Sequence, residues 1–261
     1  MTSWTKFIDT PETADHAVHV YSELSELAPS VARFLDSGFR AGEPAIVIAT
    51  EGHRGVFAEE LARLGSAPGL LERQGMLVCG DAEALLDRFM DAEAPSAERF
   101  ERVVGGLVDE LSARHPGRTI RAFGEMVDVL WRRGQRKAAI ALEELWNELA
   151  KTRSFALLCG YHLDIFEPDV QREGLPEVLG VHSHARTVAE PSRLGRAVDL
   201  ALTEVVGPVR AARIYLDVAE QIPPGSLPRG QAVLSWLGAC QLPDARAILE
   251  RARMHYRLRT A

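Results

Sequence analysis

The apolar residues of this chain fall into short runs separated by breaks that contain glycine or proline. Between these runs, apolar residues recur at three- and four-residue spacing, which is typical of helices with one buried face. Strand-like runs and helical patterns alternate from residue 16 to residue 165, so we expect an α/β fold. It should be a three-layer structure, a mostly parallel sheet with helices on both faces. The strand-like runs are residues 16–21, 44–49, 75–79, 120–123 and 154–160.

The C-terminal part of the chain has a different pattern. Helical spacing continues there without any strand-like run, and glycine and proline residues interrupt it several times. The change near Pro191 predicts two domains: an α/β domain over residues 14–188 and a small all-helical appendage over residues 192–261. The helices expected in the appendage are residues 194–206, 209–222, 231–237 and 244–256.

The stretch around Glu125 is the first candidate for function. The strand of residues 120–123 ends just before this glutamate, where open α/β sheets place their ligand-binding groups. The helix of residues 138–149 follows, and Glu143 and Glu144 flank its apolar face. Glu125 is therefore the carboxylate of greatest interest.

Polar residues also stand near the ends of the other predicted strands. Parallel strands bring their carboxyl ends to one edge of a sheet, so we expect these residues to line one pocket. The alternative is that they only cap strands and bind water. The candidates from this argument are His16, Tyr21, Glu51, Glu125, Tyr161 and His162.

Composition limits the class of protein. The chain has 261 residues, 46% of them apolar, enough for one large core or for a core with a smaller satellite domain. No run approaches the roughly 18–20 apolar residues of a membrane helix, and the first residues lack the basic-then-apolar order of a signal peptide. We therefore expect no membrane association and a cytoplasmic location. The cysteines Cys79, Cys159 and Cys240 are too few and too far apart for a disulfide framework, and we interpret them as small buried residues.

Charge argues against nucleic acid as a partner. The formal net charge is −7, and an acidic body does not attract a polyanion. Residues 191–261 are locally basic, with 10 arginines against 6 acidic residues. Arginines spread over helices are typical of a solvated face, so we expect no nucleic-acid binding.

An acid at the end of a central strand also suggests a nucleotide hydrolase. A phosphate loop of the form GxxxxGK[ST] needs glycines, so that backbone N–H groups can approach phosphate, and a lysine for the terminal phosphates. No lysine in this chain follows a glycine, and residues 21–28 contain two glutamates with neither glycine nor lysine. Carboxylates beside a triphosphate would repel it. We therefore expect no ordinary ATP hydrolysis.

Other catalytic and metal-binding motifs are also missing. The chain has no GxGxxG, GxSxG or HExxH. His16 and His19 would point to opposite faces of a strand. His182 and His184 would share a face if extended, but surface histidines are the simpler interpretation. We predict neither a metal nor a cofactor.

Several short segments, taken in order, resemble the MEDS domain, the sensory domain named for methanogens, methylotrophs and the dichloromethane-responsive regulator DcmR. The resemblance covers about residues 14–188 and lies in the whole series, because no single motif is specific. The residues beyond Pro191 are outside it. The segments are residues 16–21, 34–38, 42–48, 123–126, 142–147, 158–161 and 181–184.

The resemblance implies a KaiC/RecA-type ATPase core that has lost its phosphate loop, in agreement with the argument from the residues. It also implies a bacterial signalling module that acts with a histidine kinase, an anti-sigma component or a transcription regulator. By position, the residues that match recurrent polar residues of the family are His16, Tyr21, Glu125, Tyr161 and His182. Their implied role is a ligand pocket.

Two hypotheses for function follow. The first is a non-enzymatic sensor that binds a small organic molecule or a protein partner and passes its state on through the helical tail, by homodimer formation or docking. The alternative is a residual nucleotide-binding or hydrolytic enzyme with Glu125 as general base and Glu51 as the second acid. A DNA-binding tail is a third possibility, which the overall charge disfavours.

Overall fold

The fold is described by a computed structural model that covers residues 3–222, 227–240 and 242–258. Contacts within the chain divide it into two compact units. The first comprises Met1–His162 and Val181–Arg186, and the second comprises Leu163–Gly180 and Thr187–Ala261. The chain therefore leaves the first unit after His162 and re-enters it at Val181.

The first unit is built on a sheet of six strands in the order β3-β2-β6-β7-β1-β8, and every neighbouring pair is parallel. The parallel sheet expected from the alternation of strands and helices is confirmed. A short antiparallel pair, β4 (Met90–Asp91) and β5 (Ala94–Pro95), is separate from this sheet. The six strands are β1 His16–Tyr21, β2 Ala45–Ala49, β3 Leu77–Asp81, β6 Ile120–Gly124, β7 Phe155–His162 and β8 His184–Arg186.

Five of these strands match the predicted apolar runs, and β8 was not predicted. It is only three residues long and carries two polar residues, so it lacks the apolar signature of the others. Its place at the sheet edge comes from pairing with β1, with Ala17 opposite His184 and His19 opposite Arg186. A strand of this kind is specified by its neighbour rather than by its own sequence.

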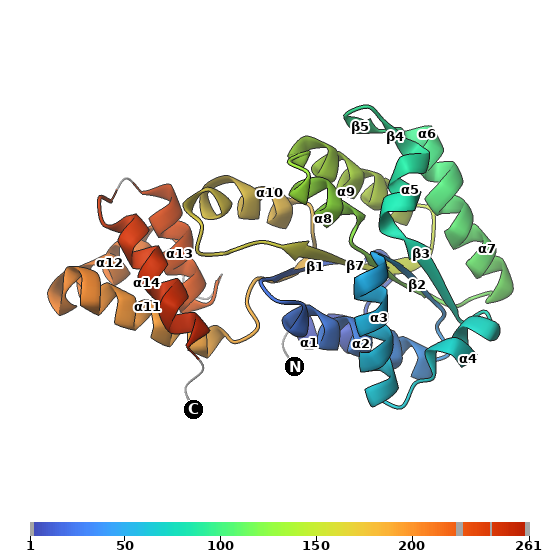
Figure 1. Cartoon of the computed structure of the whole chain (residues 1–261), viewed down its shortest axis with the longest axis horizontal. Coiled ribbons are helices and arrows are strands. Elements are labelled where there is room, and N and C mark those ends of the chain that lie inside the picture. The colour runs from blue at the N-terminus through green and yellow to red at the C-terminus, as the bar shows by residue number, and fades with distance from the viewer. Residues whose placement is uncertain (1–2, 223–226, 241, 259–261) are drawn as a thin grey trace. The chain divides into compact units, whose positions relative to one another are not determined.

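Helices cover both faces of the sheet (Figure 1). One face is covered by α1 (Ser3–Asp9), α2 (Leu24–Arg40) and α3 (Glu51–Arg63). The other carries α5 (Ala82–Phe89), α7 (Gly106–Arg114), α8 (Met126–Arg132) and α9 (Arg136–Ala150). The shorter segments α4 (Pro68–Arg73), α6 (Ala97–Phe100) and the π-helical turn η1 (Glu101–Gly105) complete the unit.

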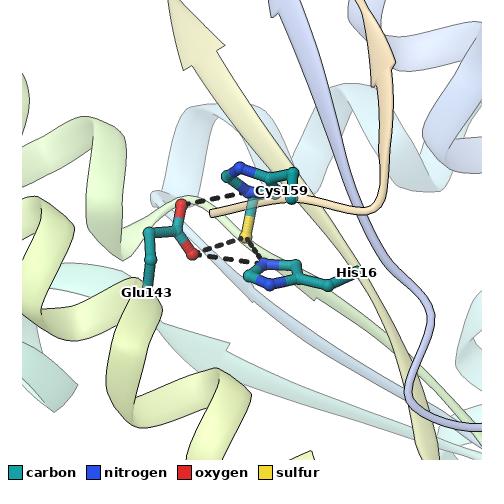
Figure 2. Close-up of side chains that lie close together, drawn as sticks. His16, Glu143 and Cys159 are labelled. Carbon is teal, nitrogen blue, oxygen red and sulfur yellow. Dashed lines mark hydrogen bonds and ion pairs between the residues drawn. The ribbon is translucent and has the colours of Figure 1, made fainter. Parts of the chain in front are cut away.

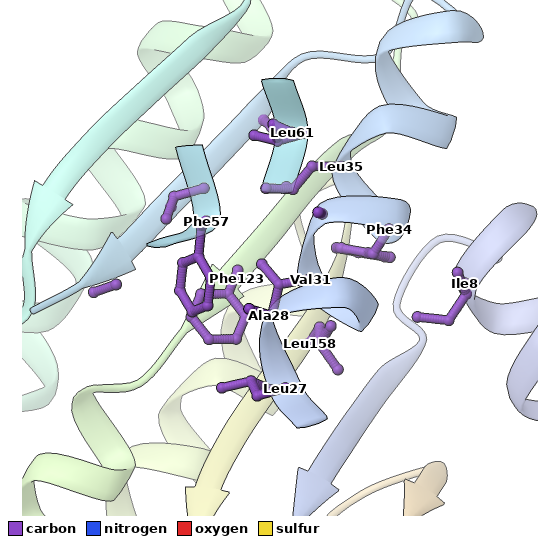
Figure 3. Close-up of a cluster of buried hydrophobic side chains, with 14 of the residues drawn as sticks. Ile8, Leu27, Ala28, Val31, Phe34, Leu35, Phe57, Leu61, Phe123 and Leu158 are labelled. Atoms are coloured by element: carbon purple, nitrogen blue, oxygen red, sulfur yellow. The ribbon is translucent and has the colours of Figure 1, made fainter. Parts of the chain in front are cut away.

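An apolar cluster lies between α2 and the sheet. Val31 and Leu35 of α2 pack with Phe57 of α3 against Phe123 of β6 and Leu158 of β7, all of them buried (Figure 3). Removing such side chains from water contributes about 25 cal/mol per Å² of apolar surface. This burial fixes α2 and α3 on the sheet and so fixes the loops at its carboxyl edge.

The start of α2 differs from the expectation. Proline is favoured in the first turn of a helix, so the sequence predicts a loop over residues 22–27 and a helix that opens at Pro29. The structure differs, because α2 begins at Leu24 and contains the proline. The carboxylate of Glu26 accepts hydrogen bonds from the backbone N–H groups of Ser22, at 3.0 Å, and Glu23, at 3.4 Å. These bonds satisfy N–H groups that have no partner within the helix, and they stabilise an earlier start.

The second unit is helical, as the pattern beyond Pro191 predicted. It also contains the segment before the first unit's last strand, with a π-helical turn η2 (Val170–Gly174) and α10 (Leu175–Gly180). No helix in the described part of the chain is long and apolar enough to cross a membrane. The remaining helices are α11 Pro191–Val206, α12 Pro208–Gln221, α13 Arg229–Ala239 and α14 Ala245–Arg257.

Candidate functional site

Glu125 lies at the carboxyl edge of the sheet, between strand β6 and helix α8. Its backbone N–H still bonds to the carbonyl of Ile48, at 3.0 Å, so the residue is held beside the end of β2. The side chain is completely buried. One carboxylate oxygen accepts from the N–H of Thr50, at 2.5 Å, and the other lies 2.6 Å from Nδ1 of His53. Both oxygens are therefore bound to groups of the β2–α3 connection.

A second carboxylate, Asp128, lies on the first turn of α8. It accepts from the backbone N–H of His162, at 2.8 Å, and pairs with Arg132, at 2.9 Å. Burial raises the pKa of the Asp128 carboxyl, while the N–H of His162 and the charge of Arg132 oppose that rise. The ring of Tyr21 lies 5.5 Å from that of His162, and its pKa is raised by burial and then by Asp128 and Glu125.

These groups make one polar network at the ends of β1, β2, β6 and β7. Its buried members are Glu125, Asp128 and Tyr21, whereas Arg132 and His162 are exposed. The Nε2–H of His162 donates to the carbonyl of Ser22, at 3.0 Å, in the turn that follows β1.

A second cluster lies beneath α9 and consists of His16, Glu143, Cys159 and His182. Nε2 of His16 is 3.2 Å from one oxygen of Glu143 and 3.3 Å from the sulfur of Cys159 (Figure 2). That sulfur is 3.4 Å from the same carboxylate oxygen, and Nε2 of His182 is 3.3 Å from the other. The four donor atoms all lie within 4.8 Å of one another.

The fold brings these four residues together from distant parts of the sequence. In the register of β1 and β7, Leu157 is opposite His16 and Cys159 is opposite Val18, so His16 and Cys159 share a face of the sheet. Ser183 donates its N–H to the carbonyl of His16, at 2.7 Å, and its Oγ accepts from the N–H of His16, at 2.9 Å. This pair of hydrogen bonds holds His182 beside His16.

Burial and neighbouring groups both shift pKa values inside this cluster. Burial opposes ionisation of Glu143, but the imidazoles of His182 and His16 outweigh it and hold the pKa of that carboxyl well below its ordinary value. Burial, and then Glu143, raise the pKa of the Cys159 thiol. Burial, Glu143 and Cys159 likewise raise the pKa of the Tyr161 hydroxyl. Because a neutral, buried thiol is a poor nucleophile, Cys159 is not suited to covalent catalysis.

The structure divides the residues singled out in the sequence between these two places. Tyr21, Glu125 and His162 lie at the carboxyl edge of the sheet. His16 begins β1 and so belongs, with His182, to the cluster under α9. The remaining two candidates, Tyr161 and Glu51, belong to neither place. Tyr161 is buried between the two groups, whereas Glu51 is exposed on the first turn of α3.

Sequence analysis missed several residues of these groups. His53 takes the place beside Glu125 that was expected for Glu51, because the third residue of α3 faces the sheet edge. Glu143 was placed beside the apolar stripe of its helix, but it is completely buried. Its spacing of three residues from Trp146 was the signal for burial. Cys159 was interpreted only as a small buried residue, and Asp128 was not considered.

The histidine pair considered in the sequence is split. His182 precedes strand β8 and faces Glu143, while Nε2 of His184 lies 3.2 Å from Asp15. His16 and His19 do point to opposite faces: the ring of His19 lies 5.5 Å from that of Trp4 on the α1 side. The metal-like partner of His182 is therefore His16, which is 166 positions away in the sequence.

Comparison with known families supports the resemblance seen in the sequence. Residues 15–182 match the model of the methanogen/methylotroph, DcmR sensory domain, abbreviated MEDS, and this is more than half of the chain. The chain belongs to the MEDS family. Both the network at the sheet edge and the cluster under α9 are built from residues of the MEDS match. A comparison with curated proteins finds no match.

Proposed function

We propose that the MEDS domain of this protein is a non-enzymatic sensory module that binds a small organic molecule or a protein partner. Membership of a sensory family supports this role. The observation that carries the proposal is the state of Glu125, whose two oxygens are held by Thr50 and His53 in a fully buried position. A carboxylate with these bonds positions the β2–α3 connection.

General-base catalysis makes a different demand on such a carboxylate. A base must reach the proton that it abstracts, directly or through one water molecule. Glu125 has no exposed surface, and Glu51, the second acid of the enzymatic hypothesis, is exposed on α3. These positions support binding, rather than general-base catalysis, as the role of Glu125.

We also propose that the core is a degenerate KaiC/RecA-type ATPase core. In a phosphate loop, backbone N–H groups after the first strand face the phosphates. Here the N–H groups of Ser22 and Glu23, which directly follow β1, point at the carboxylate of Glu26. An acidic side chain thus occupies the position that a phosphate would need, which supports loss of nucleotide hydrolysis.

The output of the sensor is assigned to the helices after the MEDS match. We propose that the domain of residues 14–188 detects the signal and that the helical domain of residues 192–261 transmits it in the cytoplasm. Transmission occurs by homodimer formation or by docking to a histidine kinase, an anti-sigma component or a transcription regulator. Duplex DNA is not the partner, because the net charge of the chain is −7.

Two measurements test the sensory function. Native mass spectrometry of the purified protein should detect a bound small molecule. Incubation with ATP and Mg²⁺ should give no turnover above that of buffer alone. Sustained hydrolysis that is lost in Glu125→Gln and in Glu51→Gln, but retained in a Glu144→Gln control, would replace the sensory proposal with the residual enzyme.

A further inference from the structure

The cluster under α9 has the donor atoms of a metal site. It offers two imidazole nitrogens, one sulfur and one carboxylate, from His16, His182, Cys159 and Glu143. Zinc and related divalent ions bind this mixture of nitrogen, sulfur and oxygen ligands in tetrahedral sites. We propose that these four residues form a closed binding site for one zinc-type divalent ion. This inference stands independently of the sensory proposal.

The distances between the donors fit such an ion. Zinc–ligand bonds of about 2.0–2.3 Å place neighbouring ligand atoms of a tetrahedron about 3.3–3.6 Å apart. Four contacts within the cluster measure 3.2, 3.3, 3.3 and 3.4 Å, with His182 facing the second oxygen of Glu143. One donor atom from each residue lies within 4.8 Å of the other three. A charge-assisted N–H···O bond is shorter, about 2.7–2.9 Å. The two nitrogen–oxygen distances, 3.2 and 3.3 Å, are therefore closer to the spacing of ligands around a shared ion than to that of direct bonds.

The orientation of His16 also prepares it for coordination. The amide nitrogen of Asn147 donates to the carbonyl of Val181, at 3.1 Å, and a carbonyl can only accept. The Asn147 oxygen therefore faces Nδ1 of His16, at 2.9 Å, and must accept a hydrogen bond from its N–H. With Nδ1 protonated, the lone pair of the neutral ring is on Nε2, which points at Glu143 and Cys159. Metal-binding histidines are commonly held in this way by a second hydrogen bond.

Charge balance favours the bound ion in this environment. The Cys159 thiolate and the Glu143 carboxylate together carry two negative charges, which a divalent ion neutralises, and the two histidines bind as neutral rings. The side chains of Glu143 and His182 have no exposed surface, and that of His16 is 5% exposed. An uncompensated charge at such a depth is costly, whereas a neutral metal site is not.

Four protein ligands leave no position for water or substrate. A site of this kind is structural, because catalytic zinc sites keep one position open. Its ligands come from β1, α9, β7 and the segment that leads into β8. His182 is the second residue after the chain returns from the second unit at Val181. The ion would therefore tie this return point to the sheet.

The decisive experiment uses Co²⁺ as a spectroscopic substitute for Zn²⁺ in the full-length protein. Protein stripped with a chelator should bind one Co²⁺ per chain and show sulfur-to-cobalt charge-transfer absorption with intense tetrahedral d–d bands. The double variant Cys79→Ser/Cys240→Ser, in which Cys159 is the remaining cysteine, should keep both signals. Cys159→Ser should lose the charge-transfer band, and circular dichroism should verify that it is folded.

A competition titration with Zn²⁺ and a chromophoric chelator measures the strength of binding. Glu143→Gln should weaken binding more than Asn147→Ala, for which the loss expected of an orienting residue is about 10- to 100-fold. Glu144→Gln, on the same helix, is the matched control and should bind as the wild type does. The proposal is overturned if the wild type shows no thiolate–cobalt band, or if the band survives in Cys159→Ser. Zinc affinity unchanged in Glu143→Gln would also overturn it.

Discussion

Nδ1 of His53, on the first turn of α3, lies 2.6 Å from the buried carboxylate of Glu125, which is 72 positions later in the sequence. The same carboxylate accepts a hydrogen bond from the N–H of Thr50, so it joins the end of β6 to the start of α3. Removing one partner of a buried, charged hydrogen bond leaves the other without compensation. The pair should therefore make a measurable contribution to stability.

We expect Glu125→Ala to lower the free energy of unfolding by roughly 3 kcal/mol. A double-mutant cycle with His53→Ala should give a coupling energy of about 1.5–3 kcal/mol. Urea denaturation of the four proteins measures both quantities. Glu51→Ala is the control and should change stability by less than about 0.5 kcal/mol, because Glu51 is exposed. A coupling energy near zero contradicts the hydrogen-bonded pair.

Gly38 in α2 lies against the buried side chain of Arg121. A Cβ at this position would be 2.6 Å from Cγ of Arg121. The guanidinium cannot move freely, because it pairs with Glu43, at 2.6 Å, and donates to the carbonyl of Ile8, at 3.1 Å. Crowding in a packed interior costs about 1–3 kcal/mol, and replacing a helical glycine by alanine returns about 1 kcal/mol.

Gly38→Ala should therefore be destabilising by up to about 2 kcal/mol, measured by urea denaturation. Gly106→Ala is the matched control, since Gly106 is also helical and a Cβ there meets no atom within 4 Å. The control should be neutral or more stable by up to about 1 kcal/mol. Equal effects of the two substitutions are inconsistent with the contact at Arg121.

His19 should make stability depend on pH. Burial, and then the charge of Arg186, lower its pKa to about 3 from the ordinary 6.5. The unfolded chain therefore takes up a proton near pH 6.5 that the folded protein does not, so stability is full above this pH and is lost as pH falls. Between pH 7.5 and pH 5 this residue alone should remove about 2 kcal/mol.

The variant His19→Leu separates this contribution from other titrations. Neither ring nitrogen of His19 has a hydrogen-bond partner among the described residues, so leucine leaves no bond unmade. Denaturation of both proteins at pH 5 and pH 7.5 should show a smaller loss for the variant, by about 2 kcal/mol. An identical pH dependence in the two proteins would show that His19 is accessible to protons in the folded state.

Metal removal should loosen one defined part of the first unit. The ion proposed under α9 would hold His182, which directly precedes the Ser183 contacts and strand β8 (His184–Arg186). Chelation should therefore lower the thermal midpoint and increase amide hydrogen exchange in peptides that cover residues 181–186. Helix α3 contributes no ligand and is the internal control. Increased exchange of equal size in α3 contradicts a local role for the ion.

Much of the fold was predictable because it depends on local patterns. Apolar runs specify β1, β2, β3, β6 and β7, and their alternation with helices specifies a parallel sheet. The place of Glu125 followed from the same argument, since it stands where β6 ends. The early start of α2 was not predicted, because the Pro29 signal outweighed the bonds that Glu26 makes to the preceding turn.

The sequence alone determined the α/β class, the change to helices near Pro191 and the absence of a phosphate loop. Only the tertiary structure decided which polar residues meet. The register of β1 on β7 puts His16 beside Cys159, the rotation of α9 turns Glu143 onto them, and the edge strand β8 returns His182. Such contacts depend on strand pairing and helix packing between segments more than a hundred positions apart. Hydrophobic periodicity shows which face of each element is buried, but not which elements pack together.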